Sequence, residues 1–496
     1  MSRTITILGG GTAGWMSAAA MAKRWVPKGF RIQLIESPDI GIIGVGEGST
    51  PRLKHFFDQL GISESDWMPK CNATFKNGIT FKGWSTKPGC ESYFHPFASY
   101  VDNKTQPAFF YNASLRRLGA AVNGQPDNYY LTSILTQKNL APLPNINFPF
   151  EVEYGYHFDS HLLGAYLRDF AVNLGANHIQ DEITSVNLSA NGDISSLTGK
   201  SGACYSGDIF IDCTGFSGKI IQQALNTKFV SYADNLFNDA AVVFATPAQD
   251  PIGCETLSTA LSSGWAWQIP LRNRTGNGYV YASPFSSADQ AETELRKHLG
   301  LLDADIEARH LKMKVGRLEQ HWNKNCLAVG LSQGFIEPLE ATALNLVCNT
   351  IEDFIHTFES SGFQRDQQSA FNQRVNSGYE SIRDYIVAHY VLNSRADSDY
   401  WIENGKNKNL SGTLNHILDL WFTGKDLATE LEKGAIRSSY RPVSWYALFG
   451  GYGIYPNLKP IELNNYLSQY SEKTIAKFLT HCALNFRDHN SVLAEQ

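Results

Sequence analysis

The sequence predicts an α/β fold that opens with a strand, a glycine-rich turn, a helix and a second strand. Residues 4–8 form a short apolar run typical of a strand, and residues 15–23 are rich in Ala and Met, as in a buried helix. A second strand-like run at 31–35 ends at an acidic residue, Glu36. The turn after the first strand has the spacing G-x-G-x-x-G, with glycines at Gly9, Gly11 and Gly14.

In this context the glycine motif predicts a dinucleotide site. Glycines permit a tight turn and close packing, and the helix N-terminus at Thr12 and Ala13 attracts a pyrophosphate. Glu36 follows the last glycine by about 20 positions, where a carboxylate can accept hydrogen bonds from ribose hydroxyls. The alternative is an ordinary glycine turn with an exposed Glu36, which the intact strand–turn–helix–strand context disfavours. The motif alone does not separate FAD from NAD.

Other elements follow from local pattern. Further strands are expected at 183–188, 210–212 and 240–244, and helices at 160–174, 341–359 and 365–390. The remainder of the chain beyond these is expected to be mostly helical. The segment 88–149 is rich in Pro, Asn and Tyr without clear periodicity, which is typical of long functional loops.

The composition fits a folded protein, with 43% hydrophobic and 18% charged residues. A net charge of -6 gives no electrostatic case for binding nucleic acid. The chain has 28 Phe, 22 Tyr and 10 Trp, and an enzyme that holds a flat aromatic substrate would use some of them.

The eight cysteines form no C-x-x-C pair and no zinc spacing, so we expect buried thiols in a reducing compartment and no metal. We find no signal-peptide pattern and no uninterrupted apolar stretch of about 18 residues. These observations predict a cytoplasmic protein without a membrane span.

Two further segments favour FAD as the dinucleotide. Residues 208–215 are an apolar strand that runs into a glycine turn, as many FAD-binding monooxygenase-like folds have near the cofactor. Residues 330–338 resemble the late flavin-contact segment of the same class, although the usual acid after the first glycine is missing. The cofactor contacts expected in this second segment are Gly330, Phe335 and Pro338.

Several motifs, in order along the chain, resemble the flavin-dependent tryptophan halogenase family. The signature W-x-W-x-I-P is present at Trp265, Trp267, Ile269 and Pro270, where the bland alternative is a tryptophan-rich core strand. Residues 44–51 resemble the family's flavin strap, with Gly46, Glu47, Ser49 and Thr50 as expected cofactor contacts. Residues 73–84 resemble its catalytic-lysine segment, and 338–343 its glutamate and halide segment. Residues 95–97 and 383–386, the latter followed by His389 and Tyr390, also match the family.

The resemblance implies a reaction and roles for residues. A separate NAD(P)H-dependent flavin reductase supplies FADH2, and oxygen and a halide ion then give hypohalous acid, which passes through the protein to Lys76. Lys76 directs the halogen onto an electron-rich aromatic carbon, either as a neutral nucleophile or as a charged hydrogen-bond donor. Glu340, which the family places near this lysine, assists loss of the ring proton. The backbone N–H groups of Thr342 and Ala343 hold the halide.

Without the resemblance, a solvated lysine is the expected interpretation of both Lys76 and Lys82. As one continuous strand, this segment places Lys76 and Lys82 on one face and Phe75, Ile79 and Phe81 on the other. Only the resemblance selects Lys76. In the same way, Glu340 alone is explained by favourable electrostatics at a helix N-terminus.

The sequence departs from the family where the substrate binds. Halogenases of free tryptophan carry a Tyr-Tyr pair and then a Glu that holds the amino-acid group; the corresponding residues here are Trp445, Tyr446 and Tyr452. Tyrosine cannot supply the charge that pairs with an ammonium group. Indole, or a larger indole-, pyrrole- or phenol-containing molecule, therefore fits better. His95 and Phe97 either stack on the aromatic ring or simply pack a loop.

We therefore expect a FAD-binding, Rossmann-like fold of the monooxygenase type with a mostly helical substrate module. The FAD-binding module is expected at 1–95 and 150–345, and the substrate module at 96–149 and 346–496. The two modules are interleaved in one structural unit. A homodimer of this unit is compatible with the sequence. Trp265 and Trp267 are hypothesised to keep organic substrate from the flavin. The alternatives are a flavin-dependent aromatic monooxygenase and a catalytically silent flavoprotein.

Overall fold

The computed structural model describes residues 3–39, 41, 44, 47–434, 436–456 and 470–496. Its contacts divide the chain into two compact units. Unit 1 comprises Met1–Ala73, Phe158–Ala233 and Met313–Tyr379. Unit 2 comprises Thr74–His157, Asp234–Lys312 and Glu380–Gln496. This division does not assign a function to either unit, so the FAD-binding and substrate modules remain predictions.

Unit 1 is built on a six-stranded sheet of order β21-β22-β13-β1-β2-β9. Its strands are β1 (Thr4–Leu8), β2 (Arg31–Glu36), β9 (Asn177–Gln180), β13 (Ile209–Asp212), β21 (Trp322–Asn323) and β22 (Cys326–Ala328). All neighbours pair in parallel except β21 and β22. The central strand β1 is buried along its whole length, including its two threonines, and the Thr6 hydroxyl donates to Ser206 O at 2.9 Å. The predicted α/β fold is confirmed.

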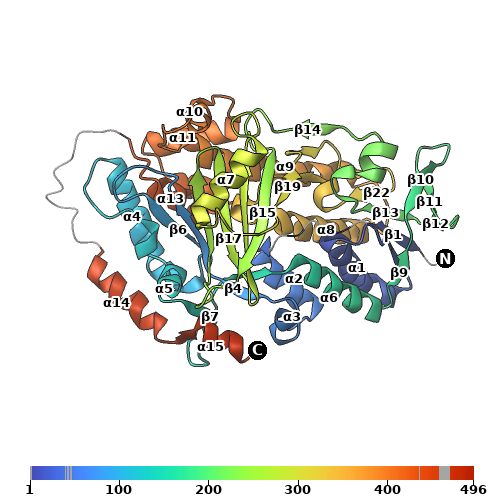
Figure 1. Cartoon of the computed structure of the whole chain (residues 1–496), viewed down its shortest axis with the longest axis horizontal. Helices are drawn as coiled ribbons and strands as arrows, with labels where there is room; N and C mark the ends of the chain where they lie inside the picture. The colour runs from blue at the N-terminus through green and yellow to red at the C-terminus, as the bar shows by residue number, and fades with distance from the viewer. Residues whose placement is uncertain (1–2, 40, 42–43, 45–46, 435, 457–469) are drawn as a thin grey trace. The chain divides into compact units, whose positions relative to one another are not determined.

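Helices pack beside this parallel sheet. Helix α1 (Thr12–Trp25) connects β1 to β2 and contacts both strands, as well as α6 (Ser160–Asn173) and α8 (Ala343–Ser360), as Figure 1 shows. Unit 1 also holds α2 (Arg52–Leu60), α3 (Glu64–Lys70) and the first part of α9 (Gln368–Val391). The three helices expected from sequence are confirmed, with two of them starting two to three residues later than expected.

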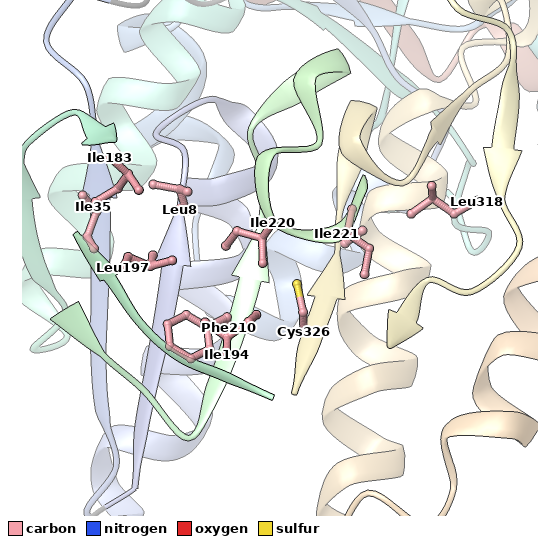
Figure 2. Close-up of a cluster of buried hydrophobic side chains, with 11 residues drawn as sticks. Leu8, Ile35, Ile183, Ile194, Leu197, Phe210, Ile220, Ile221, Leu318 and Cys326 are labelled. Atoms are coloured by element: carbon pink, nitrogen blue, oxygen red, sulfur yellow. The ribbon is translucent and has the colours of Figure 1, made fainter. Parts of the chain in front are cut away.

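A hydrophobic core joins the sheet to a second, antiparallel sheet of β10 (Ile183–Leu188), β11 (Ile194–Gly199) and β12 (Cys204–Ser206). Figure 2 shows Leu8, Ile35 and Phe210 of the parallel sheet facing Ile183 and Leu197 of this smaller sheet. Two side chains of the π-helix η5 (Lys219–Ala224), Ile220 and Ile221, complete the cluster. These contacts fix the end of β13 on both sides. They also support the glycine turn that follows β1, the neighbouring strand.

The remaining elements of unit 1 are short. They are η1 (Val26–Lys28), β3 (Glu47–Gly48), η4 (Gly215–Ser217), β14 (Phe229–Ser231), β20 (Gly316–Leu318), η6 (Gly330–Ser332), β23 (Gly334–Phe335) and η7 (Pro338–Glu340). Strands β14, β20 and β23 form a small antiparallel sheet.

Unit 2 is built on a seven-stranded sheet of order β19-β15-β18-β17-β16-β5-β6. Its strands are β5 (Gly78–Lys82), β6 (Ser92–Pro96), β15 (Ala240–Pro247), β16 (Thr256–Leu261), β17 (Gly264–Pro270), β18 (Arg274–Tyr281) and β19 (Arg309–Lys312). Helix α7 (Ala288–Leu299) lies across one face and buries Ala291 and Leu295 against it (Figure 1). Along each strand, the side chains that alternate with those facing α7 lie on the opposite face of the sheet.

The other elements of unit 2 are mostly helical, as expected for the end of the chain. They are β4 (Thr74–Lys76), η2 (Tyr100–Lys104), α4 (Gln106–Arg117), η3 (Pro126–Asn128), α5 (Leu131–Gln137), β7 (Leu140–Pro144), β8 (Gly155–Phe158), the end of α9, α10 (Asp399–Lys406), α11 (Gly412–Phe422), α12 (Leu427–Glu432), α13 (Pro442–Gly451), α14 (Glu472–Ala483), β24 (Phe486–Asp488) and α15 (His489–Ala494). The prediction of a long loop at 88–149 is wrong, because this segment contains two strands and two α-helices.

The expected single strand around Lys76 is also wrong. The chain forms two strands, and they belong to different sheets: β4 pairs with β8, while β5 pairs with β16 and β6. Asn77 lies between them, and its backbone N–H donates to Cys254 O at 2.7 Å rather than to a strand partner. The alternation expected across the whole segment is therefore interrupted directly after Lys76.

All eight cysteines are free, and Cys204 is exposed, contrary to the expectation that all are buried. Within the described ranges, no helix is long and apolar enough to cross a membrane. The same residues contain no group of three or more His, Cys, Asp or Glu side chains that could hold a metal ion.

Candidate active site

The first part of the site is the glycine turn of unit 1. A Cβ added at Gly14 would overlap the carbonyl oxygen of Gly9, so the turn closes only with glycine there. At Gly11, by contrast, no atom of the described residues lies within 4 Å of an added Cβ. Gly11 is also the N-cap of α1 and provides no side-chain cap, so the first N–H groups of the helix, at Thr12 and Ala13, face this open space. Such an arrangement fits a pyrophosphate.

Glu36 stands at the end of β2, beside this turn. Its Oε1 lies 2.6 Å from His178 Nε2 of the neighbouring strand β9. The His178 ring packs edge-on against Trp15 of α1, with ring centroids 5.1 Å apart. The carboxylate is therefore held in place by a neighbour, as a ribose-binding group needs to be, and the residues present fit a dinucleotide.

The two sequence segments that favoured FAD lie beside the same turn. Gly330 has a φ of +75°, and a Cβ there would come within 2.8 Å of the Ala13 Cβ. Ser332 donates to Asp212 O at 2.5 Å, which ties η6 to the end of β13. Phe335 lies further along the segment, where its ring meets Phe216 at 5.7 Å. The structure thus brings Gly330 to the glycine turn.

Asp212 organises the turn that follows β13. Its fully buried carboxylate accepts hydrogen bonds from the backbone N–H groups of Thr214, Ile220 and Ile221 and from the Thr214 hydroxyl, at 2.7 to 3.0 Å. Burial raises the pKa of Asp212, while these bonds oppose the rise. The sequence showed an acid before a glycine turn but gave no sign of this structural role.

The strap residues are only partly described. Gly46 lies outside the described residues. Glu47 is half-buried, and burial together with the negative charge of Asp159 raises its pKa to about 7. Ser49 is buried, and Thr50 accepts a hydrogen bond from the N–H of Leu53 at the start of α2.

Glu340 and the expected halide residues lie at the start of α8. Pro338 opens the short helix η7, which ends at Glu340 with a side chain only 5% exposed. Ala341 has a φ of +54°, a left-handed conformation that costs free energy in a residue other than glycine. This turn leads to Thr342 and Ala343, where α8 begins without a side-chain cap. The first N–H groups of this helix are consequently available for an anion.

Lys76 of unit 2 is completely buried. Its side chain has 0% exposure, whereas Lys82, six residues later, is exposed. The Lys76 ammonium lies 5.6 Å from the centroid of the Phe97 ring, in the range of a cation–π interaction. The solvated interpretation is therefore correct for Lys82 and wrong for Lys76.

A neutral histidine lies close to Lys76. His157, fully buried on β8, contacts Thr74 Oγ1 at 3.3 Å through Nδ1 and Thr256 Oγ1 at 2.8 Å through Nε2. Thr74 donates its proton to Pro270 O at 2.7 Å, so Nδ1 of His157 donates to Thr74 and Nε2 accepts from Thr256. Burial, followed by the charge of Lys76, lowers the pKa of His157 well below its ordinary value.

The expected aromatic-pocket residues form two groups. His95 pairs across the sheet with Ile79, approaches Ser444 Oγ at 3.1 Å, and lies 6.1 Å from the Tyr385 ring. Trp445 meets the same Tyr385 ring at 4.9 Å. The structure thus links His95 to Trp445 through Tyr385. Tyr446 points instead toward α4 and α11, where its ring lies 4.2 Å from Phe110 and 5.2 Å from Trp421.

Tyr452 is the residue that the sequence resemblance sets at the position of the substrate-binding glutamate, an assignment that stays a prediction. It is 1% exposed, and its hydroxyl contacts His389 Nδ1 at 3.0 Å. Its ring stacks on Trp84 at 6.4 Å and meets Tyr93 edge-on at 5.5 Å. Aromatic side chains and a histidine therefore surround this position.

The signature tryptophans lie on β17 with their rings 5.8 Å apart, on the strand face that alternates with the α7 contacts. Trp267 fits because Gly278 opposes it on β18, where any Cβ would overlap the indole ring. Ile269 and Pro270 end the strand, and both are buried. The shielding role of the tryptophans stays a prediction.

Four further residues contact the expected site residues or their chain neighbours, and the sequence assigned none of them a role. His157 and His489 contact Thr74 and Phe75, just before Lys76. Tyr385 contacts His95, and His389 contacts Tyr452. Tyr385 and His389 fall in a segment that resembles the family, while His157 and His489 carried no recognisable signal.

Comparisons with known proteins agree with this geometry. The sequence profile of the family described as "Tryptophan halogenase" matches residues 4–464. The tryptophan 6-halogenase SttH of Streptomyces toxytricini is 35% identical over 449 residues, which cover 84% of this chain and 83% of SttH. Among solved structures, the flavin-dependent halogenase BrvH from Brevundimonas sp. BAL3 superposes with a TM-score of 0.84 at 32% identity, covering 100% of this chain and 99% of BrvH.

A second solved structure, the flavin-dependent halogenase Xcc4156 from Xanthomonas campestris, superposes with a TM-score of 0.86 at 29% identity. The match covers 100% of this chain and 98% of Xcc4156. Coverage of this extent includes both the glycine turn of unit 1 and the lysine strand of unit 2. The chain therefore belongs to the tryptophan halogenase family and is a flavin-dependent halogenase.

Proposed function

We propose that this enzyme transfers chloride or bromide, at the oxidation level of hypohalous acid, to an uncharged indole-type aromatic, and that Lys76 directs the transfer. The observation that carries the proposal is the burial of Lys76, which has 0% exposure and stands over Phe97. A lysine in such a place is rare unless it has a function, because desolvating an ammonium group is costly.

When bound, reduced FAD with oxygen and halide supplies the hypohalous acid, HOX. As a neutral amine, the Lys76 Nζ attacks X of HOX, forming an N–X bond and releasing water. As an ammonium group, it donates a hydrogen bond to the oxygen of HOX and makes X more electrophilic. The aromatic carbon then takes X as the N–X bond breaks and restores the amine, or as the O–X bond breaks and the oxygen leaves as water once it has gained a proton. In both cases the carbon then loses its own proton.

We assign the proton loss to Glu340 and the halide to the N-terminal N–H groups of α8. The Glu340 carboxyl is 5% exposed on η7, so water competes little with it as a base. The N–H groups after Thr342 have no side-chain cap, and an anion there is favoured by the helix dipole. Family membership supports both assignments.

The surroundings of Tyr452 support an uncharged substrate. A tyrosine whose hydroxyl contacts His389 offers no negative charge to an ammonium group. SttH, by its name, is a tryptophan 6-halogenase, so free tryptophan is the substrate with which an uncharged indole is to be compared. An indole without the amino-acid group needs no such charge.

The direct test is mass spectrometry of products from the purified protein with FAD, NADH, a flavin reductase, bromide or chloride, and a panel of indoles, pyrroles and phenols. We expect a halogen isotope pattern on an indole. Lys76→Ala should lower product formation by at least about 10²-fold, since it removes the directing group. Lys82→Ala is the matched control, because its side chain is exposed, and it should leave the rate unchanged.

Other products would change the conclusion. A hydroxylated product without halogen supports a monooxygenase, and oxygen consumption without any product across the panel supports a silent flavoprotein. Equal product from Lys76→Ala and wild type would refute the role of Lys76.

The substrate class is tested by comparing indole with free tryptophan. The two share the reacting ring, but tryptophan adds an ammonium and a carboxylate that must be desolvated at the Tyr452 end. We expect kcat/KM for indole to exceed that for tryptophan by at least about tenfold. A preference for tryptophan would show that another group supplies the missing charge.

We further propose that a separate NAD(P)H-dependent flavin reductase supplies the reduced cofactor in the cytoplasm. The eight free cysteines support a reducing compartment. A homodimer is also proposed, and light scattering of the purified protein measures it directly.

A further inference from the structure

Among the described residues, no strand pairs with one edge of the strand that carries Lys76. On its inner edge β4 pairs with β8, with Thr74 opposite His157 and Lys76 opposite Gly155. The N–H groups of Phe75 and Asn77 point the other way. Asn77 N donates to Cys254 O at 2.7 Å, and Phe75 N donates to His489 Nε2 at 3.3 Å. A side chain from the last helix thus completes the outer edge.

The tautomer of His489 follows from its other contact. Its Nδ1 lies 3.1 Å from Ile252 O, and a carbonyl oxygen can only accept, so Nδ1 carries the proton and Nε2 is the acceptor. Burial lowers the pKa of His489 to about 4, so the ring is neutral at physiological pH. The imidazole therefore links Ile252 C=O to Phe75 N–H, two residues before the direct bond between Cys254 and Asn77. Phe75 N therefore donates to the His489 ring, which stands between it and Ile252 O.

Helix α15 is fixed at both ends, so His489 cannot drift. The neighbouring Asn490 accepts from Ile252 N at 2.9 Å through Oδ1, and His489 N donates to Asn139 O at 3.0 Å. At the far end, Arg272 donates to Leu493 O at 2.7 Å. Arg272 lies two residues after the end of the signature strand β17, so the helix is fixed to the same sheet that β5 joins.

These contacts bear on the lysine because it lies between two anchored residues. Thr74 is held by its bond to Pro270 O, Phe75 by His489 and Asn77 by Cys254. Without the His489 acceptor, the Phe75 N–H is buried with no partner from this edge, and the backbone must shift to find one. A shift of the backbone moves the end of a four-carbon side chain, and misplacing a reacting group by about 1 Å costs up to about 10²-fold in rate.

We propose that His489 is a positioning residue for Lys76, holding the backbone of β4 from the C-terminal helix α15. The inference rests on the proposed role of Lys76 in directing the halogen. His489 does not touch the reacting atoms, and its effect passes through the Phe75 amide. It therefore controls how much of the hypohalous acid is delivered to the substrate and not how much is formed.

The test compares three variants of the full-length protein. His489→Leu removes the acceptor, and His489→Gln retains an amide oxygen that can reach Phe75 N. Ser491→Ala is the control on the same helix, because its side chain is exposed and contacts neither β4 nor Ile252. With FAD, NADH, reductase, bromide and indole, we measure bromoindole formed per oxygen consumed, and free hypobromous acid by a chemical scavenger. Hydrogen–deuterium exchange over residues 74–77 is measured in parallel, without any turnover.

We expect His489→Leu to lower bromoindole per oxygen by about tenfold, with more scavenged hypobromous acid and unchanged FAD affinity. Exchange over 74–77 should be faster in this variant only. His489→Gln and Ser491→Ala should stay within about twofold of wild type in both measurements. Equal loss in His489→Leu and Ser491→Ala, or no rescue by His489→Gln, would overturn the positioning role.

The outcomes separate the two proposals. Failure of Lys76→Ala to lower bromination refutes the lysine mechanism, whatever the His489 variants do. If Lys76→Ala abolishes bromination while His489→Leu brominates and exchanges like wild type, the lysine mechanism stands and the role of His489 is refuted.

Discussion

Asp212 is a residue whose importance comes from the number of donors it satisfies. Each carboxylate oxygen accepts two hydrogen bonds: Oδ1 from the N–H and hydroxyl of Thr214, and Oδ2 from the N–H groups of Ile220 and Ile221. An asparagine has only one acceptor oxygen, and its amide hydrogens would face one pair of donors. The substitution is isosteric, so its effect reports on the hydrogen bonds rather than on packing.

We predict that Asp212→Asn lowers the free energy of unfolding by about 2–3 kcal/mol, because at least one buried donor pair loses its acceptor. FAD affinity should fall as well, since the turn after β13 lies beside Gly330 and the glycine turn. Chemical denaturation and a fluorescence titration with FAD measure the two effects. Asp208→Asn is the control: Asp208 is exposed at the other end of the same strand and accepts one bond, from Thr4 N at 2.7 Å. Similar effects of the two substitutions would contradict the role of Asp212.

At this scale the chemical roles of the site residues stay predictions, whereas the structure shows where the residues lie. Lys76 and Glu340 were selected by resemblance, and the structure finds both buried. The face on which Lys76 lies was not predictable, because the strand breaks at Asn77 and β4 and β5 take different partners. The contact of His489 could not be predicted from the sequence, because Phe75 and His489 are 414 positions apart. No local pattern identifies a histidine that accepts a hydrogen bond from the edge of a strand.

Among the elements, the start of α1 contains two glycines, Gly11 and Gly14, that are required for different reasons. The motif alone does not distinguish these reasons. At Gly14 an added Cβ would overlap Gly9 O, so glycine is required for the turn itself. At Gly11 the backbone has φ of -72° and ψ of 179°, which alanine adopts freely, and no described atom lies within 4 Å. Glycine is needed at this position only if a ligand approaches the backbone.

We therefore predict that Gly11→Ala weakens FAD binding by at least about tenfold while the melting temperature of the FAD-free protein is unchanged. Gly14→Ala should instead lower the free energy of unfolding by about 2–4 kcal/mol, because the backbone must move to remove the overlap. Thermal denaturation without FAD and titration with FAD distinguish the two variants. If Gly11→Ala binds FAD normally, the pyrophosphate does not lie over this turn.

Elements defined by local pattern were predicted well, and those defined by distant partners were not. The strand–turn–helix–strand unit at the start of the chain was expected from spacing alone, because β1, α1 and β2 are consecutive and pack on one another. The segment 88–149 showed no period because its helices are short and bury irregular sets of side chains. In α4, for example, the buried residues include Asn112 and Arg117, and Arg117 donates three hydrogen bonds to carbonyls around the end of α11.

For the molecule as a whole, two kinds of buried titratable group act on stability in opposite directions. Burial lowers the pKa of His489 to about 4 and that of His321 to about 3, and the pKa of His157 is also lowered. Burial raises the pKa of Asp102 and Asp127 to about 6. Below pH 6.5 the unfolded chain binds more protons at these histidines, which destabilises the fold. Between pH 4 and 6 the folded chain binds more protons at the two carboxyls, which stabilises it.

Because these effects oppose one another, the pH dependence of the free energy of unfolding does not isolate the contribution of a single group. Comparison with a variant that lacks one titrating group does isolate it. His489 faces the Ile252 carbonyl and Asp488, which raise its pKa, and Arg272, which lowers it, and burial is the largest cause. Its folded pKa of about 4 lies below the unfolded value of 6.5, so the neutral ring contributes fully above pH 6.5 and loses its contribution as the pH falls toward 4. His489→Gln has no such titration.

We predict that, between pH 7 and pH 4, the wild type loses about 3 kcal/mol more of its free energy of unfolding than His489→Gln does. Chemical denaturation of both proteins at half-unit pH steps measures the difference, and all other titrating groups cancel in the comparison. A constant difference across this range would mean that His489 is charged in the fold, or that Nε2 is reached by solvent. Either result would contradict the neutral, buried bridge between Ile252 and Phe75 on which the alignment of β4 depends.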